Sequence, residues 1–338
     1  MKVPVLAVPA SPRLASAIRL LLGLTLSALC LWLGLREVSL ADLRATARGL
    51  DWWSVLLATA LVALAPAMRA YRWQILFRPR RARYLSLLEA VLVGHMVNIA
   101  APGRFGEVAR LYLVGRSTGH PAGLIAGTVA VEKLLEIVGL VSFSLIVGPL
   151  LPLPPTVRAS LVVLSLSATL ILLLGLLSAR FKEQLDALVT RVLGIKDSTA
   201  TRWLRVQIAH VLSSLDVLRR GGDTLLVLAW TWLVWGLGAG VNWLAMRAMH
   251  LELPWTAAFV VLVTLQVGVA LPSAPGKVGV FQALCLFALG LYGVPTSTAF
   301  SYGVLLYGIV FGPPLFNGVT AFLVGQGLRR AWQPARVG

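Results

Sequence analysis

Charged residues are scarce in this chain of 338 residues, because Asp, Glu, Lys and Arg together make up only 13% of it. Soluble domains carry about 25% of such residues. Apolar residues reach 58% instead, and the mean hydropathy is +0.84. This composition excludes a soluble enzyme, a disordered chain and a solenoid, and it predicts an all-α polytopic membrane protein. At about 20 residues per span, the length allows about seven to ten helices that cross or enter the membrane.

Cysteine and histidine are also rare. The two cysteines, Cys30 and Cys285, lie far apart inside apolar runs, so they predict neither a disulfide framework nor a thiolate metal site. The four histidines form no cluster with them in the sequence. We therefore expect no metal ion and no other cofactor.

Acidic residues are few, at 13 against 30 basic ones, which leaves a net charge of +17. In a soluble protein this excess would suggest nucleic acid. Here the basic residues lie mostly between apolar runs, as topology determinants and headgroup contacts do, so we expect no nucleic-acid partner. The positive-inside rule predicts that segments 69–83 and 180–220 are cytoplasmic and that turns 149–158 and 292–298 are external. Both termini are then cytoplasmic, and the expected location is the cell (inner or plasma) membrane.

Long apolar runs predict the helices. Six of them should cross the membrane, over residues 14–35, 52–76, 122–148, 159–179, 223–249 and 298–326. The first follows a basic N-terminus without a clear cleavage site, so we expect an uncleaved helix. Two further stretches, 86–116 and 256–292, are each broken by a Pro-Gly pair and predict two half-length helices apiece. Residues 180–222 show helical spacing of apolar residues, which predicts either amphipathic surface helices or an ordinary connector helix.

The two broken stretches resemble each other. Each has Pro-Gly, a basic residue, an apolar residue and a second glycine, with an offset of 275 − 102 = 173 residues. The matching residues are Pro102, Gly103, Arg104 and Gly106 in the first stretch, and Pro275, Gly276, Lys277 and Gly279 in the second. The predicted topology places the ends of the first stretch in the cytoplasm and those of the second outside. The sequence therefore predicts two inverted repeats, each with a re-entrant helical hairpin flanked by full transmembrane helices.

This organisation makes residues 1–338 a single membrane domain. Repeat 1 covers 52–148 with hairpin 86–116, a connecting span and amphipathic segment cover 149–222, and repeat 2 covers 223–326 with hairpin 256–292. Discontinuous helices in corresponding positions of inverted halves indicate a substrate site near the membrane midplane. The freed backbone N–H groups and the adjacent bases there favour an anion. The alternative is that both breaks are packing kinks.

Charged side chains also occur within the predicted spans, where they are costly and usually functional. They are Arg104, Glu107 and Arg110 after the first break, and Glu132, Lys133 and Glu136 in the helix over 122–148. We expect the last five of these to converge on one buried network, which either binds a headgroup or only holds the helices together. The candidate substrate-binding residues are Asn98, Pro102, Gly103, Arg104, Gly106, Glu107, Arg110, Glu132, Lys133, Glu136, Pro275, Gly276, Lys277, Gly279 and Gln282. His95 is interpreted either as a core histidine or as a further member of the cavity.

Three ordered motifs carry a resemblance to a known family. The runs Asn98 to Arg110, Val131 to Glu136 and Leu271 to Gln282 resemble the transmembrane region of lysylphosphatidylglycerol synthases and their stand-alone flippase-like relatives. The resemblance implies two inverted units with re-entrant hairpins and translocation of aminoacylated phosphatidylglycerol between leaflets. Other members accompany glycosylation, polyprenol-linked sugars or hopanoid synthesis. The family often has an acid at the position of Gln282 and an arginine near Tyr307, so the second half of this chain is less charged.

The leading functional hypothesis is a lipid flippase that moves a phosphate-bearing lipid, whether anionic, aminoacylated or linked through polyprenyl phosphate. The alternatives are a membrane enzyme or accessory subunit in lipid-linked sugar or hopanoid metabolism, and a small-solute secondary transporter. The chain shows no nucleotide motif and no metal cluster, so we expect no enzymatic activity and assign no catalytic residue. The expected partners are membrane lipids with anionic headgroups, with a homo-oligomer and a separate lipid-modifying enzyme as further candidates.

Overall fold

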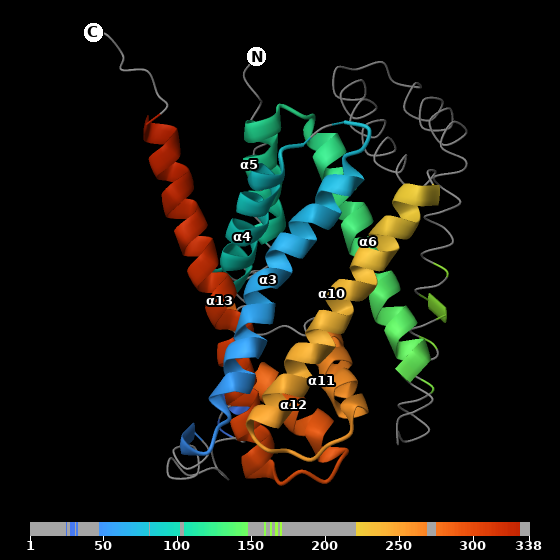
Figure 1. Cartoon of the computed structure of the whole chain (residues 1–338), viewed down its shortest axis with the longest axis vertical. Helices are drawn as coiled ribbons and strands as arrows, with labels where there is room; N and C mark the ends of the chain where they lie inside the picture. The colour runs from blue at the N-terminus through green and yellow to red at the C-terminus, as the bar shows by residue number, and fades with distance from the viewer. Residues whose placement is uncertain are drawn as a thin grey trace.

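The structure is a computed structural model of the whole chain (Figure 1). It describes residues 47–80, 82–101, 105–147, 221–268 and 275–331, together with isolated positions at 25, 28–30, 32, 159, 163, 166, 167 and 170. All secondary structure in these ranges is helical, which confirms the predicted all-α class. The predicted helices 14–35 and 159–179, the segment 180–220 and residues 102–104 lie wholly or largely outside the described residues.

Nine helical elements make up the described part of the chain. They are α3 (Trp52–Leu76), α4 (Tyr84–Ala100), α5 (Phe105–Thr118), α6 (Ala122–Val147), α10 (Gly221–Ala248), α11 (Trp255–Gly268), the 3-10 turn η3 (Pro275–Lys277), α12 (Val280–Gly290) and α13 (Thr296–Ala331). Helices are present at the four long ranges predicted here, and the two broken stretches are confirmed as interrupted helices. Among the described residues, three of the four are long and apolar enough to cross a membrane, namely Trp52–Leu76, Gly221–Ala248 and Thr296–Gly325.

The start of α3 shows how a local signal sets a helix boundary. Asp51 is the N-cap, and its carboxylate accepts hydrogen bonds from the Trp53 backbone N–H at 3.1 Å and the Ser54 hydroxyl at 2.6 Å. These bonds satisfy donors that the first turn leaves free. The hydrogen bond from Ser54 lowers the pKa of Asp51, which keeps a negative charge at the positive end of the helix.

The two hairpins lie at opposite ends of the molecule. In Figure 1, α4 and α5 occupy the upper half, while α11 and α12 occupy the lower half. Helix α4 ends where Ala101 becomes extended, with φ −107° and ψ 142°. In the second hairpin, Gly276, Lys277 and Gly279 have φ of 71°, 60° and 86°. Glycine adopts this left-handed region readily, so the Pro-Gly-x-x-Gly motif allows the chain to turn before α12 starts.

The contacts between helices come in matched pairs. The first set is α3, α4, α5 and α6, and the second set is α10, α11, α12 and α13. In the first set α3 contacts α4 and α4 contacts α5; in the second set α10 contacts α11 and α11 contacts α12. The crossed contacts match as well, because α4 packs on α13 and α11 packs on α6. Helices α3 and α10 pack against each other at the centre. The two sets of four helices therefore share one packing pattern.

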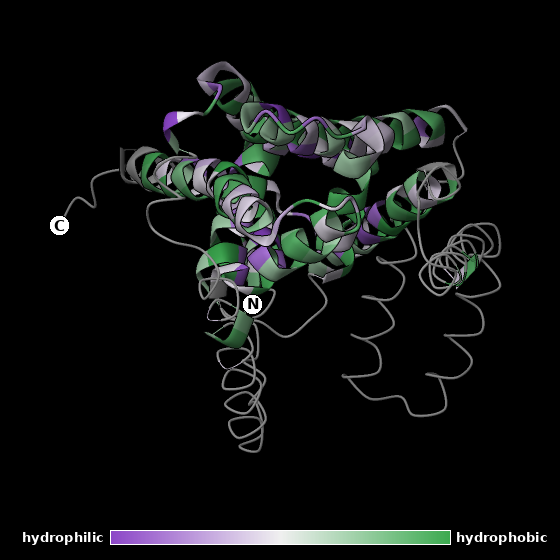
Figure 2. Ribbon diagram, turned by 90° about the horizontal axis from the view of Figure 1, so that it is seen from below, coloured by the Kyte–Doolittle hydropathy of each residue, from purple (hydrophilic) through white to green (hydrophobic). Residues whose placement is uncertain are grey.

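Each set of helices contributes most of one apolar core. One cluster of buried side chains includes Trp73, Leu87 and Ile125 from α3, α4 and α6, and another includes Val261 and Leu289 from α11 and α12. A third, smaller cluster joins α6 to α10 and α11. Large apolar side chains are also exposed on the outside, and hydrophobic colours predominate along the helices in Figure 2. An apolar exterior over apolar cores is expected of helices that face lipid.

Candidate functional site

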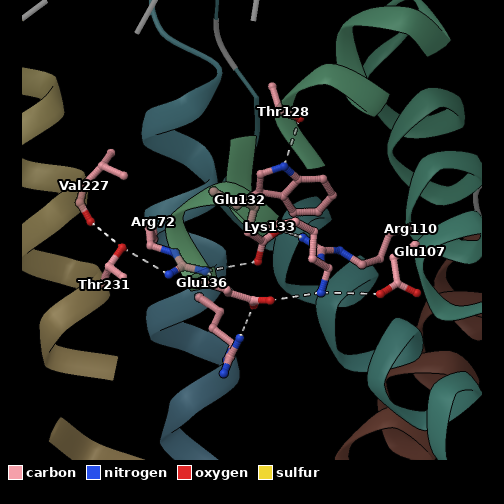
Figure 3. A network of polar contacts seen from close by, with 11 residues as sticks. Arg72, Glu107, Arg110, Thr128, Glu132, Lys133, Glu136, Val227 and Thr231 are labelled. Carbon is pink, nitrogen blue, oxygen red and sulfur yellow. Dashed lines mark hydrogen bonds and ion pairs between the residues drawn. The ribbon is translucent and has the colours of Figure 1, made fainter. Parts of the chain in front are cut away.

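A buried carboxylate, Glu132 of α6, lies at the centre of the candidate site. Its side chain is almost fully enclosed and faces two arginines from other helices (Figure 3). One is Arg72 of α3, whose Nη2 lies 3.4 Å from Glu132 Oε1; the other is Arg110 of α5, whose Nη2 donates to Glu132 Oε2. Three helices thus meet through one carboxylate.

A second, more accessible carboxylate belongs to the same network. Glu136, one turn after Glu132, accepts from Arg69 Nη1 at 2.7 Å and from Lys133 Nζ at 3.0 Å. Lys133 Nζ also lies 3.4 Å from Glu107 Oε1, and 41% of its side chain is exposed. Four basic residues and three carboxylates form these ion pairs, so their charges sum to 4 − 3 = +1. The network therefore has an excess of positive charge, and Lys133 forms its open end.

Neutral groups hold the two buried arginines in place. Arg72 Nη1 donates to Thr231 Oγ1 at 3.2 Å, and Thr231 in turn donates to the Val227 carbonyl of its own helix α10. The Arg110 guanidinium lies 4.0 Å from the centroid of the Trp73 ring, a cation–π contact. Trp73 Nε1 donates to Thr128 of α6. The network therefore joins α3, α5 and α6 and reaches α10.

Some buried polar atoms of this network have no hydrogen-bond partner among the described residues. They are the Nε atoms of Arg72 and Arg110 and the Oε2 atom of Glu107. Buried donors and acceptors in proteins are nearly always satisfied by protein groups or by water, so water or another polar group is expected beside these atoms.

The predicted convergence of Glu107, Arg110, Glu132, Lys133 and Glu136 is confirmed by these ion pairs. The sequence analysis missed two members. They are Arg69 and Arg72, which the sequence alone places in the basic segment 69–83; both lie within α3, and Arg72 is completely buried. Their i, i+3 spacing inside the apolar run 52–76 was the signal that could have placed them on one inward face.

His95 of α4 lies beside the network. It interacts electrostatically with Arg69, Arg110 and both carboxylates of α6, and it is half-buried. This position connects α4, the first half of the hairpin, to the charged site.

The first helix break is held by a close approach of α4 and α5. The Gly106 backbone N–H donates to Asn98 Oδ1 at 2.8 Å. A Cβ atom on Gly106 would lie 2.1 Å from the Gly94 carbonyl oxygen, so only glycine fits. Asn98 and Gly106 therefore hold α4 and α5 together and are not part of the ion-pair network. Pro102, Gly103 and Arg104, between the two helices, lie outside the described residues.

The second break lies next to the end of the first hairpin. The turn η3 contacts α4, and a Cβ built on Gly276 would come within 3.9 Å of the Ile99 carbonyl oxygen and 2.8 Å of Tyr307 Oη. Lys277 is half-buried here and has an interaction partner. Buried Gln282 is used within its own helix, because its Oε1 accepts from the Gly279 N–H at 2.7 Å. The second break thus lies against the end of α4 in the first hairpin.

The second half contains a buried neutral pair between two helices. It is formed by Asn242 of α10 and Tyr302 of α13. The Tyr302 hydroxyl lies 3.2 Å from both the Asn242 carbonyl oxygen and its Oδ1, and both residues are buried. A neutral hydrogen bond thus joins α10 and α13, whereas ion pairs join α3, α5 and α6.

The described residues contain no group of three His, Cys, Asp or Glu side chains arranged to hold a metal ion. Compared with known families, the sequence matches the one described as the lysylphosphatidylglycerol synthase TM region, over residues 20–318. A comparison with curated proteins gives no match.

Proposed function

Since the chain belongs to the lysylphosphatidylglycerol synthase transmembrane-region family, we propose that it moves a lipid with a phosphate-bearing headgroup between the two leaflets of a membrane. Membership already indicates a membrane protein involved in lipid handling. The observation that supports lipid movement in particular is the contact between the two hairpins, where η3 lies against the end of α4. Broken helix ends cannot face lipid, so they line a polar path through the protein.

We also propose that residues 52–147 and 221–331 are inverted repeats with re-entrant hairpins. The placement of the hairpins at opposite ends of the molecule and the matched helix contacts support this arrangement (Figure 1). In transporters of this type, one unit moves against the other around a fixed central site, which opens alternately to each side.

The charge of the network supports an anionic ligand. Its excess positive charge, the unpartnered Nε atoms of Arg72 and Arg110 and the half-exposed Lys133 suit a phosphate, whose oxygens accept several hydrogen bonds. The 3.4 Å pair between Lys133 and Glu107 is the weakest accessible contact of the network, and a phosphate would displace it first. The carboxylates are all ion-paired, which suits positioning of the bases rather than bond chemistry. We therefore propose a carrier that leaves its lipid unchanged.

The test is leaflet exchange of labelled lipids in liposomes that contain the purified chain, comparing phosphatidylglycerol with phosphatidylcholine. Lys133→Gln should slow exchange of the anionic lipid about tenfold, because one charged hydrogen bond contributes about 1.5 kcal/mol or more. Arg104→Gln should act in the same direction, and Arg104→Lys should do less harm because the charge remains.

Arg247→Gln is the matched control. Arg247 is an exposed base on α10 that stacks on Trp243, outside the network, so its loss should leave exchange unchanged. Equal exchange of both lipids by the unmodified chain, with no effect of Lys133→Gln, would contradict the proposal.

A further inference from the structure

A pocket separate from the charged network lies at the arginine-rich end of the first half. It has a volume of about 570 Å³, within the range of small-ligand sites. Its walls come from the end of α3, the loop that leads into α4 and the last turn of α5. The lining residues are Tyr71, Gln74, Ile75, Arg78, Arg80, Ala82, Arg83, Ser117 and Thr118.

The charge of this pocket is strongly one-sided. Three arginines line it, and the only carboxylate that pairs with any of them in the described part of the chain is Asp223, 2.6 Å from Arg78 Nη1. Arg80 and Arg83 are exposed and have no ion-pair partner among the described residues. Arg83 is also the N-cap of α4 and provides no side-chain acceptor, and the first turn has no acidic residue. The positive end of the α4 dipole therefore adds to the three guanidinium charges.

Other contacts give the pocket a defined shape and an apolar side. Gln74 Nε2 donates to the Ala82 carbonyl at 2.9 Å, which fixes the loop carrying the arginines. The hydroxyls of Ser117 and Thr118 both donate to the Val114 carbonyl, so they satisfy this acceptor near the end of α5. Tyr71 is partly exposed and packs on Trp230, with 5.0 Å between ring centroids. The pocket could therefore hold a ligand whose anionic group lies at the arginines and whose apolar part lies at Tyr71.

From this geometry we infer that the pocket is a binding site for a phosphate group, distinct from the network around Glu132. Arg78, Arg80 and Arg83 donate to the phosphate oxygens, since guanidinium groups match that geometry in bidentate fashion. The phosphate belongs either to the headgroup of an anionic lipid or to a soluble phosphate ester. Asp223 competes with it for Arg78, so binding of the anion loosens an ion pair that joins the turn after α3 to α10.

The experiment has two arms on the purified full chain. In one, glycerol phosphate is titrated in neutral detergent; in the other, native mass spectrometry counts phosphatidylglycerol against phosphatidylcholine bound from mixed micelles. The double variant R80Q/R83Q should lose at least about tenfold in affinity, because two charged hydrogen-bond donors are removed. Asp223→Asn should bind more tightly than the unmodified chain, because it frees Arg78.

Arg116→Gln removes one positive charge at the same end of the molecule, from an exposed arginine that does not line the pocket, so it should bind phosphate normally. Loss of binding in R80Q/R83Q with normal binding in Arg116→Gln supports the site. If the loss occurs with glycerol phosphate, the ligand is a soluble phosphate ester; if it occurs with phosphatidylglycerol, the ligand is a lipid. Absence of binding in both arms, or an equal loss in Arg116→Gln, would overturn it and leave a solvated basic face.

Discussion

Glu132 is the residue at which the structure predicts the largest energetic effect of one substitution. Its carboxylate is 1% exposed, and its partners Arg72 and Arg110 are 0% and 6% exposed. Glu132→Gln keeps the shape of the side chain but leaves two buried guanidinium groups facing a neutral amide. Removal of one partner from a buried ion pair costs about 3–5 kcal/mol. We expect the free energy of unfolding to fall by this amount.

Glu136→Gln provides the comparison within the same network. Its side chain is 26% exposed, and its two close partners, Arg69 and Lys133, are also partly exposed. Such pairs contribute about 0.2–1 kcal/mol each, so the loss should be at most about 2 kcal/mol. Reversible unfolding in mixed micelles, followed by tryptophan fluorescence, measures both variants. Equal destabilisation by the two substitutions would refute the burial argument.

A double-mutant cycle then isolates the pair between Arg110 and Glu132. In the double variant Arg110→Gln/Glu132→Gln, the remaining Arg72 still has Glu136 at 3.8 Å. The double variant should therefore be less destabilised than the sum of the single ones, by about 0.5–3 kcal/mol. Strict additivity would show that the two side chains do not stabilise each other.

Two further predictions address the hairpins. Gly106→Ala should destabilise the protein by about 1–3 kcal/mol, because its Cβ would lie 2.1 Å from the Gly94 carbonyl oxygen. Gly115→Ala should not, because its Cβ would have only an ordinary contact at 3.6 Å. Thermal unfolding of the two variants measures the difference. On a cysteine-free background, single cysteines at 118 and 294 should react with a membrane-impermeant reagent from the cytoplasm and the exterior respectively, and labelling of both from one side would contradict the inverted repeat.

Most helix positions could be predicted from the sequence because the signals for them are local. The apolar run over 52–76 coincides with α3, and the run over 122–148 with α6. Pro-Gly pairs interrupt a helix wherever they occur, so both broken stretches were also predictable. The repeat of one motif at an offset of 173 further indicated two similar halves.

The partners of the charged residues could not be predicted as fully. The sequence showed that Glu107, Glu132 and Glu136 need basic partners at membrane depth. That Arg72 is one of these partners depends on how α3 packs against α6, which no local spacing specifies. In the same way, Tyr302 pairs with Asn242 only because α13 packs against α10. The bond between Gln282 and Gly279 is local by contrast, since the two residues are three positions apart.

The sequence by itself therefore determined the membrane character of the chain, its helices and the matched breaks, because hydrophobicity and backbone geometry act along the chain. The tertiary structure alone decided that η3 meets the end of α4, that Arg72 and Arg110 share Glu132 and that three arginines surround a pocket. These features depend on contacts between residues more than 20 positions apart, as between Arg110 and Glu132 with a separation of 22. Such contacts form only when the helices pack, so their chemistry cannot be read from neighbouring residues.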